Sequence, residues 1–190
     1  MSTLEWIAAG LGIVTILLVV RRSIWNFPVA LAMVTLYFFV FLDAKLYSDA
    51  LLQIFFVAIN LYGWWAWSRA PQVDDGVAVD GMSANARANW LAGTAIGSGL
   101  LGWTMATYTD AAAPYADAAV AGMSIAAQLL QSLRRVESWI AWIAVDVVAV
   151  GLYASRGLYP TAGLYAVFLV LATVGLIEWR RQASGRAVPA

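Results

Sequence analysis

The sequence predicts an all-α integral membrane protein with seven transmembrane helices. We expect two parallel three-helix repeats joined by one linking helix, a 3+1+3 layout. Composition, a series of long apolar segments and an internal repeat carry this prediction. Of the 190 residues, 63% are hydrophobic and 12% are charged, whereas soluble domains are about 45–50% apolar and about 25% charged. So little polar surface cannot cover a globule in water, which argues against a soluble enzyme.

The composition also excludes several kinds of chemistry. The chain has no Cys and no His, and its 11 basic and 11 acidic side chains give a formal net charge of zero. Without Cys and His there is no disulfide, thiolate nucleophile or imidazole proton relay, and no metal site built from these ligands. The zero net charge argues against nucleic acid as a partner. We therefore expect no cofactor, no metal and no nucleic acid.

Seven apolar segments are long enough to cross a bilayer, for which about 20 helical residues suffice. They cover residues 4–20, 24–42, 46–67, 88–108, 112–131, 139–154 and 158–179. No basic segment precedes the first of them, so we expect a retained helix and not a signal peptide. The connections are short except for residues 68–87, where Pro71, Asp74 and Gly76 predict a solvated loop.

The charges in the connections orient the helices. Two basic residues, Lys45 and Arg156, lie on one side of the predicted membrane, and nine lie on the other. The nine are Arg21, Arg22, Arg69, Arg87, Arg134, Arg135, Arg180, Arg181 and Arg186. Because cytoplasmic connections carry the excess of basic residues, we predict a cytoplasmic C-terminus and an N-terminus outside.

A constant shift in residue number, which we term the repeat offset, aligns two parts of the chain without a gap. It takes Arg22 to Arg134, Leu46-Tyr47 to Leu158-Tyr159, Gly63 to Gly175 and Trp67 to Trp179. Chance similarity between apolar helices is the alternative. We predict two three-helix repeats at 1–69 and 112–181, a cytoplasmic loop at 70–87, a linking helix at 88–108 and a cytoplasmic tail at 182–190. The linking helix restores the orientation of the second repeat, and binding sites in such proteins lie between the repeats near the midplane.

Polar side chains inside the spans are the candidate binding residues, since a charge at the centre of a membrane helix costs about 2.5–3.5 kcal/mol and is expected to face a cavity. Helical spacing places them on stripes in the third, fifth and sixth segments. Asp117 and Ser124 extend the stripe of the fifth segment, and Glu137 lies at the mouth of the sixth. The candidate site residues are Trp139, Trp142, Asp146, Gln53, Asn60, Trp64 and Gln128.

These residue types suit a flat, polar, cationic ring. Indole faces stack on rings and attract cations, each worth about 0.5–2 kcal/mol. Amides donate and accept, which suits sugar hydroxyls, and Asp146 can pair with a positive ring.

Structural roles are the alternative for several positions. Trp65, Trp67 and Trp179 stand near helix ends, where we expect them to anchor the protein at the membrane interface. Gln and Asn often bond neighbouring helices. We expect Gly63 and Gly175 to be packing positions, and the Arg pairs to be topology signals and not substrate clamps.

Motifs near the helix ends occur together. They are Tyr62-Gly63-Trp64 followed by Trp67, Gln53 upstream of it, Gln128 before an Arg pair, the run Glu137-x-Trp139-x-x-Trp142-x-x-x-Asp146, and the late Tyr165, Gly175 and Trp179. With these motifs the chain resembles the PnuC family of bacterial vitamin-precursor transporters over nearly its whole length.

The resemblance implies facilitated diffusion (uniport) of nicotinamide riboside across the bacterial inner membrane, with net uptake driven by a cytoplasmic kinase that phosphorylates the substrate. It also implies a homotrimer with a substrate path in each subunit. By motif match, Trp139 and Trp142 would stack on or cap the pyridinium ring of the substrate, and position 146 would hydrogen-bond it. Asn is the residue expected there for the family, whereas this chain has Asp146.

Other functions stay open. Related members carry thiamine, riboflavin or deoxynucleosides, so a facilitator for thiamine or another vitamin is the alternative within the class, and a carboxylate favours a cationic ligand over neutral riboflavin. A non-transporting membrane scaffold or sensor is the alternative from another class. A membrane enzyme would need a nucleophile–base pair or a metal cluster at membrane depth, and the sequence contains no such pattern.

Overall fold

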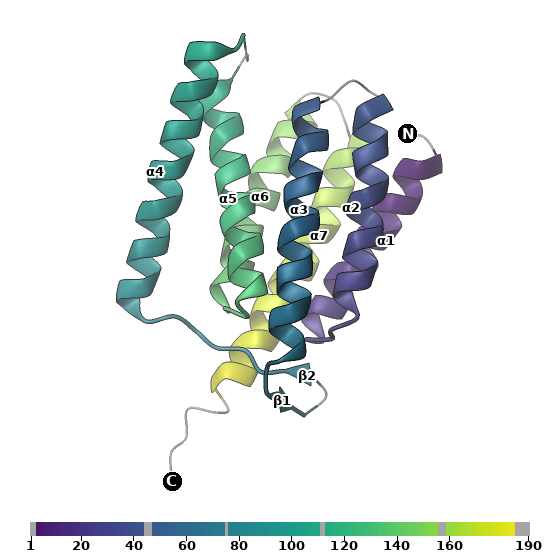
Figure 1. Cartoon of the computed structure of the whole chain (residues 1–190), viewed down its shortest axis with the longest axis vertical. Coiled ribbons are helices and arrows are strands. Elements are labelled where there is room, and N and C mark those ends of the chain that lie inside the picture. Colours follow the sequence, from purple (N-terminus) through teal and green to yellow (C-terminus); the bar gives the residue numbers. More distant parts are fainter. Residues whose placement is uncertain (1–2, 44–46, 75, 111–112, 156–158, 185–190) are drawn as a thin grey trace. The chain divides into compact units, whose positions relative to one another are not determined.

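A computed structural model describes residues 3–43, 47–74, 76–110, 113–155 and 159–184. These ranges hold seven α-helices and one short β-hairpin (Figure 1). The helices are α1 (Thr3–Val20), α2 (Asn26–Asp43), α3 (Tyr47–Ser68), α4 (Ala84–Tyr108), α5 (Pro114–Ser132), α6 (Glu137–Ser155) and α7 (Tyr159–Ser184). The predicted basic residues Lys45, Arg156 and Arg186 and the repeat positions Leu46 and Leu158 lie outside the described residues.

Each helix covers one of the seven predicted spans, so the all-α prediction is confirmed. The largest difference at a helix start is in α4, which begins at Ala84 and not at residue 88. Ser83 is the reason, because it has extended backbone angles and its hydroxyl accepts from the Ala86 amide at 3.3 Å. Such a cap satisfies an amide that the first helical turn leaves unpaired.

Several helices have the length and composition of membrane spans. Within the described ranges, Asn26–Asp43, Ala50–Ser68 and Ala162–Ser184 are long and apolar enough to cross a bilayer, and Trp6–Val20 is a shorter apolar helix. Many large apolar side chains on these helices are exposed, among them Phe39, Leu51 and Val170. Exposed apolar faces of this kind suit contact with lipid.

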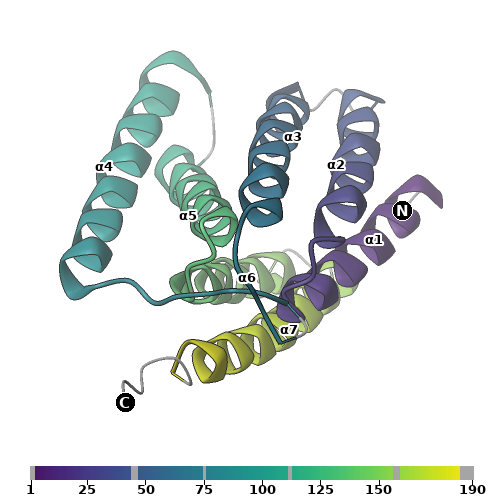
Figure 2. The ribbon, with the colours of Figure 1, turned by 60° about the horizontal axis from the view of Figure 1, so that its bottom comes forward.

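The chain divides into two compact units, which we describe separately. Unit 1 comprises Met1–Val79 and Ser132–Arg134, and unit 2 comprises Asp80–Gln131 and Arg135–Ala190. In unit 1, α2 packs against α1 and α3 (Figure 1). In unit 2, α6 packs against α7, and α4 diverges from α5 toward the α4 N-terminus (Figure 2).

The core of unit 1 contains an aromatic pair packed on a glycine. The rings of Phe27 and Trp67 meet edge to face, with centroids 5.2 Å apart and an interplanar angle of 87°. A Cβ added to Gly63 would lie 2.5 Å from the Phe27 ring. The Trp67 indole N–H also donates to the backbone oxygen of Ser132 at 3.2 Å. Gly63 is therefore a packing position, as predicted.

The same packing recurs in unit 2 at the repeat offset. Trp139 and Trp179 meet edge to face at 5.4 Å and 87°. A Cβ added to Gly175 would lie 2.5 Å from the Trp139 ring. Phe27, Gly63 and Trp67 thus have counterparts in Trp139, Gly175 and Trp179 both in sequence and in contact geometry. The prediction that Gly175 is a packing position is confirmed.

The turns after α1 and α5 also match at this offset. Arg22 and Arg134 both have a left-handed backbone, with φ of 56° and 60°. The next amide in each turn, from Ser23 or Arg135, bonds a carbonyl five residues back at 2.9 or 2.8 Å. A left-handed residue followed by such a bond is the Schellman ending of a helix. The two turns therefore end their helices by the same mechanism.

The long connection after α3 is more ordered than predicted. Strands β1 (Gln72–Val73) and β2 (Gly76–Val77) form an antiparallel hairpin, and Val77 and Val79 are buried. The Arg22 guanidinium donates to the backbone oxygens of Val73 and Val77 at 3.2 and 3.5 Å. The prediction of a solvated loop is therefore wrong for residues 77–79, which are apolar and pack instead of facing water.

Candidate substrate-binding site

The polar face of α6 is the centre of the candidate site. Trp142 and Asp146 are four residues apart, so helical geometry places them on the same face. Asp146 is 5% exposed, and among the described residues its carboxylate has no hydrogen bond or ion pair. A buried carboxylate without a partner is costly. Asp146 is therefore a candidate to contact a ligand that supplies a donor or a positive charge.

The orientation of Trp142 is fixed by a residue that the sequence analysis missed. The half-buried indole N–H of Trp142 donates to the side-chain oxygen of Gln131 at 2.9 Å. Gln131 lies in the last turn of α5, three residues after Gln128. That spacing places both amides on one helical face, which was the available signal.

The predicted stripe on α5 is only partly buried. Gln128 is 8% exposed and Ser124 is half-buried, with its hydroxyl bonded to the Val120 backbone oxygen at 2.9 Å. Asp117 is exposed in the first turn of the helix. Gln128 is therefore the member of this stripe with the burial expected of a binding residue.

Trp139 has different surroundings from Trp142. It is 2% exposed and packs on Trp179 and Gly175, in the place that Phe27 occupies in unit 1. Its indole N–H is buried and has no hydrogen-bond partner within the described ranges. The environment of Trp139 is therefore that of a packing residue.

In unit 1, the candidate residues lie on α3. Gln53 and Asn60 are 8% and 4% exposed, whereas Trp64 is 38% exposed. Gln53 lines a groove of about 220 Å³ together with Phe38 and Phe39. Gln53 and Asn60 thus share the buried face of α3, and Trp64 lies outside it.

The polar residues of α6 have apolar counterparts in unit 1. The repeat offset relates Trp142 to Ala30 and Asp146 to Val34, and both counterparts are buried. The aromatic and glycine contacts recur in both units, while this polar chemistry occurs in unit 2. The packing of three helices therefore does not require Trp142 and Asp146.

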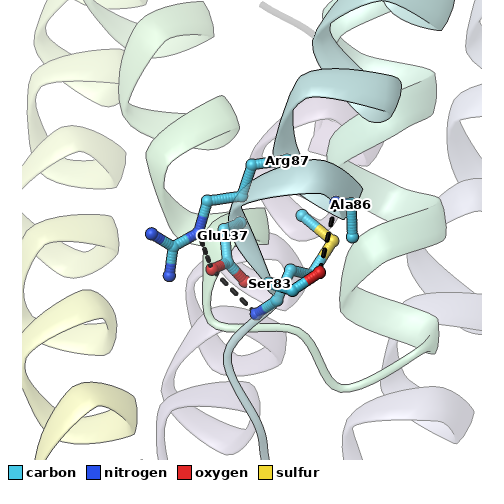
Figure 3. A network of polar contacts seen from close by, with 5 residues as sticks. Ser83, Ala86, Arg87 and Glu137 are labelled. Atoms are coloured by element: carbon cyan, nitrogen blue, oxygen red, sulfur yellow. Dashed lines mark hydrogen bonds and ion pairs between the residues drawn. The ribbon is translucent and has the colours of Figure 1, made fainter.

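A network at the start of α6 fastens the connection before α4 (Figure 3). One Glu137 carboxylate oxygen accepts from the Arg87 Nε at 2.8 Å and from the Met82 amide at 3.0 Å. Beside it, the Val136 amide donates to the Asp80 backbone oxygen at 3.0 Å. Glu137 thus holds the N-terminal part of α4 against α6.

Two of the predicted interface anchors are interior residues. Trp67 and Trp179 are both 0% exposed, so the prediction that they anchor at the membrane surface is wrong. Their rings fill the aromatic pairs described above. Trp65 is 53% exposed and lies 4.6 Å from the Arg69 guanidinium, an arrangement that suits an anchor. Its anchoring role stays a prediction.

Unit 2 also contains an open cleft of about 470 Å³ between α4 and α5. Its lining is mostly apolar and includes Gly93 and Gly97 on α4 and Gly122 on α5. None of the seven candidate residues lines it. The cleft is therefore distinct from the polar face of α6.

Comparison with known proteins decides the family. A family model described as nicotinamide mononucleotide transporter matches residues 2–181. This chain belongs to that family, the PnuC family. The match covers six helices in full and α7 up to residue 181, so the resemblance noted from the motifs is confirmed.

Curated relatives in the PnuC family are transporters. The nicotinamide riboside transporter PnuC of Escherichia coli is 27% identical over 98% of this chain and 88% of its own length. The nicotinamide riboside transporter PnuC of Neisseria mucosa is 26% identical over 95% of this chain and 73% of its own length. The riboflavin/roseoflavin transporter RibM of Streptomyces davaonensis is 30% identical over 89% of this chain and 80% of its own length.

A solved structure shares the fold. The crystal structure of the vitamin B3 transporter PnuC matches with a TM-score of 0.83 and 23% identity, over 97% of this chain and 83% of that one. This likeness confirms the all-α membrane fold. With the PnuC family membership, it makes the chain a multi-pass membrane transporter and not an enzyme.

Proposed function

We propose that this PnuC-family member is a facilitator for nicotinamide riboside. The observation that carries the proposal is the Asp146 carboxylate, buried on α6 beside Trp142 with no bonding partner among the described residues. Nicotinamide riboside presents a flat ring with a positive charge. A carboxylate attracts that charge, and an indole face stacks on that ring. Two relatives are named for this substrate.

The amide candidates suit the remainder of the substrate. Gln128 in unit 2 and Gln53 and Asn60 in unit 1 carry groups that both donate and accept, as ribose hydroxyls require. We propose that Gln128 binds the sugar; the binding roles of Gln53 and Asn60 in unit 1 stay predictions from the sequence. Trp64 and Trp139 complete the candidate set, with Trp139 acting through packing and Trp64 through its exposed ring.

Riboflavin is the second candidate, since the 30% identical relative is a riboflavin/roseoflavin transporter. The isoalloxazine ring is flat but neutral, so it would leave Asp146 without a counter-charge. Thiamine, a cationic vitamin, would meet the same carboxylate. Charge therefore favours nicotinamide riboside or thiamine over riboflavin, and the names of the relatives favour the former.

We propose transport by uniport across the bacterial inner membrane, with the N-terminus outside and the C-terminus in the cytoplasm. The absence of His removes the commonest proton relay. Net uptake would then depend on a cytoplasmic kinase that traps the substrate by phosphorylation. We further propose a homotrimer, which native mass spectrometry of the purified protein would detect at three times the 20.5 kDa chain mass.

Transport into liposomes tests the proposal. Purified protein should equilibrate labelled nicotinamide riboside without any ion gradient, and excess unlabelled thiamine or riboflavin should compete less well than unlabelled nicotinamide riboside. A requirement for a proton or sodium gradient would exclude uniport. Uptake of riboflavin without uptake of nicotinamide riboside would replace the proposed substrate, and uptake of none of the three would remove it.

A further inference from the structure

The hydrogen bond between Trp142 and Gln131 links two helices of unit 2. The indole N–H of Trp142 in α6 donates to the Gln131 side-chain oxygen at the end of α5, with a length of 2.9 Å. Both residues are half-buried. An indole has a single donor, so this bond fixes the direction of the ring edge. Because the ring is also attached to α6 through its own side chain, the bond restricts the direction of the ring face.

Unit 1 shows that the fold does not need this polar pair. The repeat offset relates Gln131 to Val19 and Trp142 to Ala30. Val19 is 1% exposed and Ala30 is 3% exposed, so two small apolar side chains fill the corresponding positions. Since the neighbouring aromatic and glycine contacts are the same in both units, the packing tolerates an apolar pair. The polar pair in unit 2 therefore serves something other than packing.

We propose that Gln131 is a positioning residue for substrate binding. Its side-chain oxygen holds the Trp142 ring so that the face of the ring is presented to a flat, cationic substrate. This inference rests on the proposed function, because it assumes that Trp142 contacts the transported ring. Stacking and cation–π attraction depend on the angle and offset of the ring. An indole free to rotate would therefore bind more weakly.

Affinity measurements on four full-length variants test this role. Gln131→Met keeps the length of the side chain but removes the acceptor, Gln131→Glu keeps an acceptor oxygen, and Trp142→Phe removes the donor. The fourth variant combines Gln131→Met with Trp142→Phe. Isothermal titration of nicotinamide riboside gives the Kd of each, and a thermal melt gives its Tm.

We expect Gln131→Met to weaken binding about fivefold, because substrate binding must then order an indole ring that the bond no longer holds, with a Tm close to that of the wild type. Gln131→Glu should retain most of the affinity. In the Trp142→Phe background, Gln131→Met should change the Kd no further, because the bond is already absent. Gln182→Met is the matched control, since Gln182 bonds Glu178 at 3.2 Å on α7, and we expect it to leave the Kd unchanged.

Three results would overturn the inference: an unchanged Kd in Gln131→Met, equal losses with and without Trp142→Phe, or a loss in Gln131→Glu as large as in Gln131→Met. Where Gln131→Met fails to fold, Gln131→Val takes its place, because Val19 occupies the corresponding position in unit 1. Failure of the proposed function would look different, since the wild type itself would not bind nicotinamide riboside. The Kd values of the same variants would then be measured with whichever of thiamine or riboflavin the wild type binds.

Discussion

Asp146 is the residue on which substrate charge should depend most. Its carboxylate is buried without a partner in the described part of the chain, so a cationic ligand gains an attraction that no protein group competes for. We expect Asp146→Ala or Trp142→Ala to weaken nicotinamide riboside binding by about 1–2 kcal/mol, measured by titration calorimetry. Asp117→Ala is the control, because Asp117 is exposed at the start of α5. Unchanged affinity in both test variants would remove the proposed site.

Gly175 should tolerate no larger side chain. An added Cβ would lie 2.5 Å from the Trp139 ring, and overpacking of this kind costs about 1–3 kcal/mol. We expect Gly175→Ala to lower the Tm in detergent. Gly163→Ala is the control on the same helix, because a Cβ there would meet nothing within 4 Å. Equal melting temperatures for the two variants would contradict the packing role.

The sequence predicted individual site residues unevenly. Spacing was sufficient to place Trp142 and Asp146 on one face of α6, since four residues along a helix fix a shared face. Their role in binding stays a prediction. The bond from Trp142 to Gln131 was missed because it joins two helices, and no spacing rule reports which side chains meet across a turn. Trp67 and Trp179 were misassigned for a related reason. Position near a helix end suggests an interface, but burial depends on the neighbouring helix.

The connection between β2 and α4 should be the part of the chain whose hydrogen exchange changes most when Glu137 is substituted. This residue accepts from the Met82 amide and from Arg87 with one carboxylate oxygen (Figure 3). We expect Glu137→Ala to speed hydrogen exchange at the Met82 amide, and Glu137→Gln to protect it because the amide oxygen can still accept. Exchange mass spectrometry of the peptide over residues 80–87 measures the effect.

Arg87→Ala should speed the same exchange less than Glu137→Ala does. The Arg87 side chain is 56% exposed and exposed ion pairs are weak, whereas the bond from Met82 would remain. Glu178→Ala on α7 is the control and should leave this peptide unchanged. Equal exchange in Glu137→Ala and the wild type would contradict the fastening described above.

The helices were predictable from the sequence because each is a long apolar segment between short polar connections. The ends were less so: α4 begins at Ala84 because Ser83 caps it, although apolar residues become dense only later. The hairpin was missed for a different reason. Its strands are two residues each, and the bonds that hold it come from Arg22, which lies in the turn after α1, far from the hairpin in sequence.

At the scale of the whole molecule, the absence of Cys makes the membrane topology directly testable. We predict that Ser68→Cys reacts with a membrane-impermeant thiol reagent only from the cytoplasmic side, and Asp110→Cys only from outside. Both positions are exposed, at the ends of α3 and α4. Labelling of both positions from the same side would mean that α4 does not cross the membrane. Labelling of each position from the side opposite to the one predicted would show that the orientation is the reverse of the prediction.

The hairpin after α3 has a practical consequence for anyone who wishes to fuse a reporter domain to this transporter. The longest connection between helices would be the first choice for an insertion. However, the Arg22 side chain hydrogen-bonds both strands of that hairpin. An insertion there would also disrupt the packing of the buried Val77 and Val79. We expect the exposed Asp110, beyond the end of α4, to be a better insertion point than this hairpin.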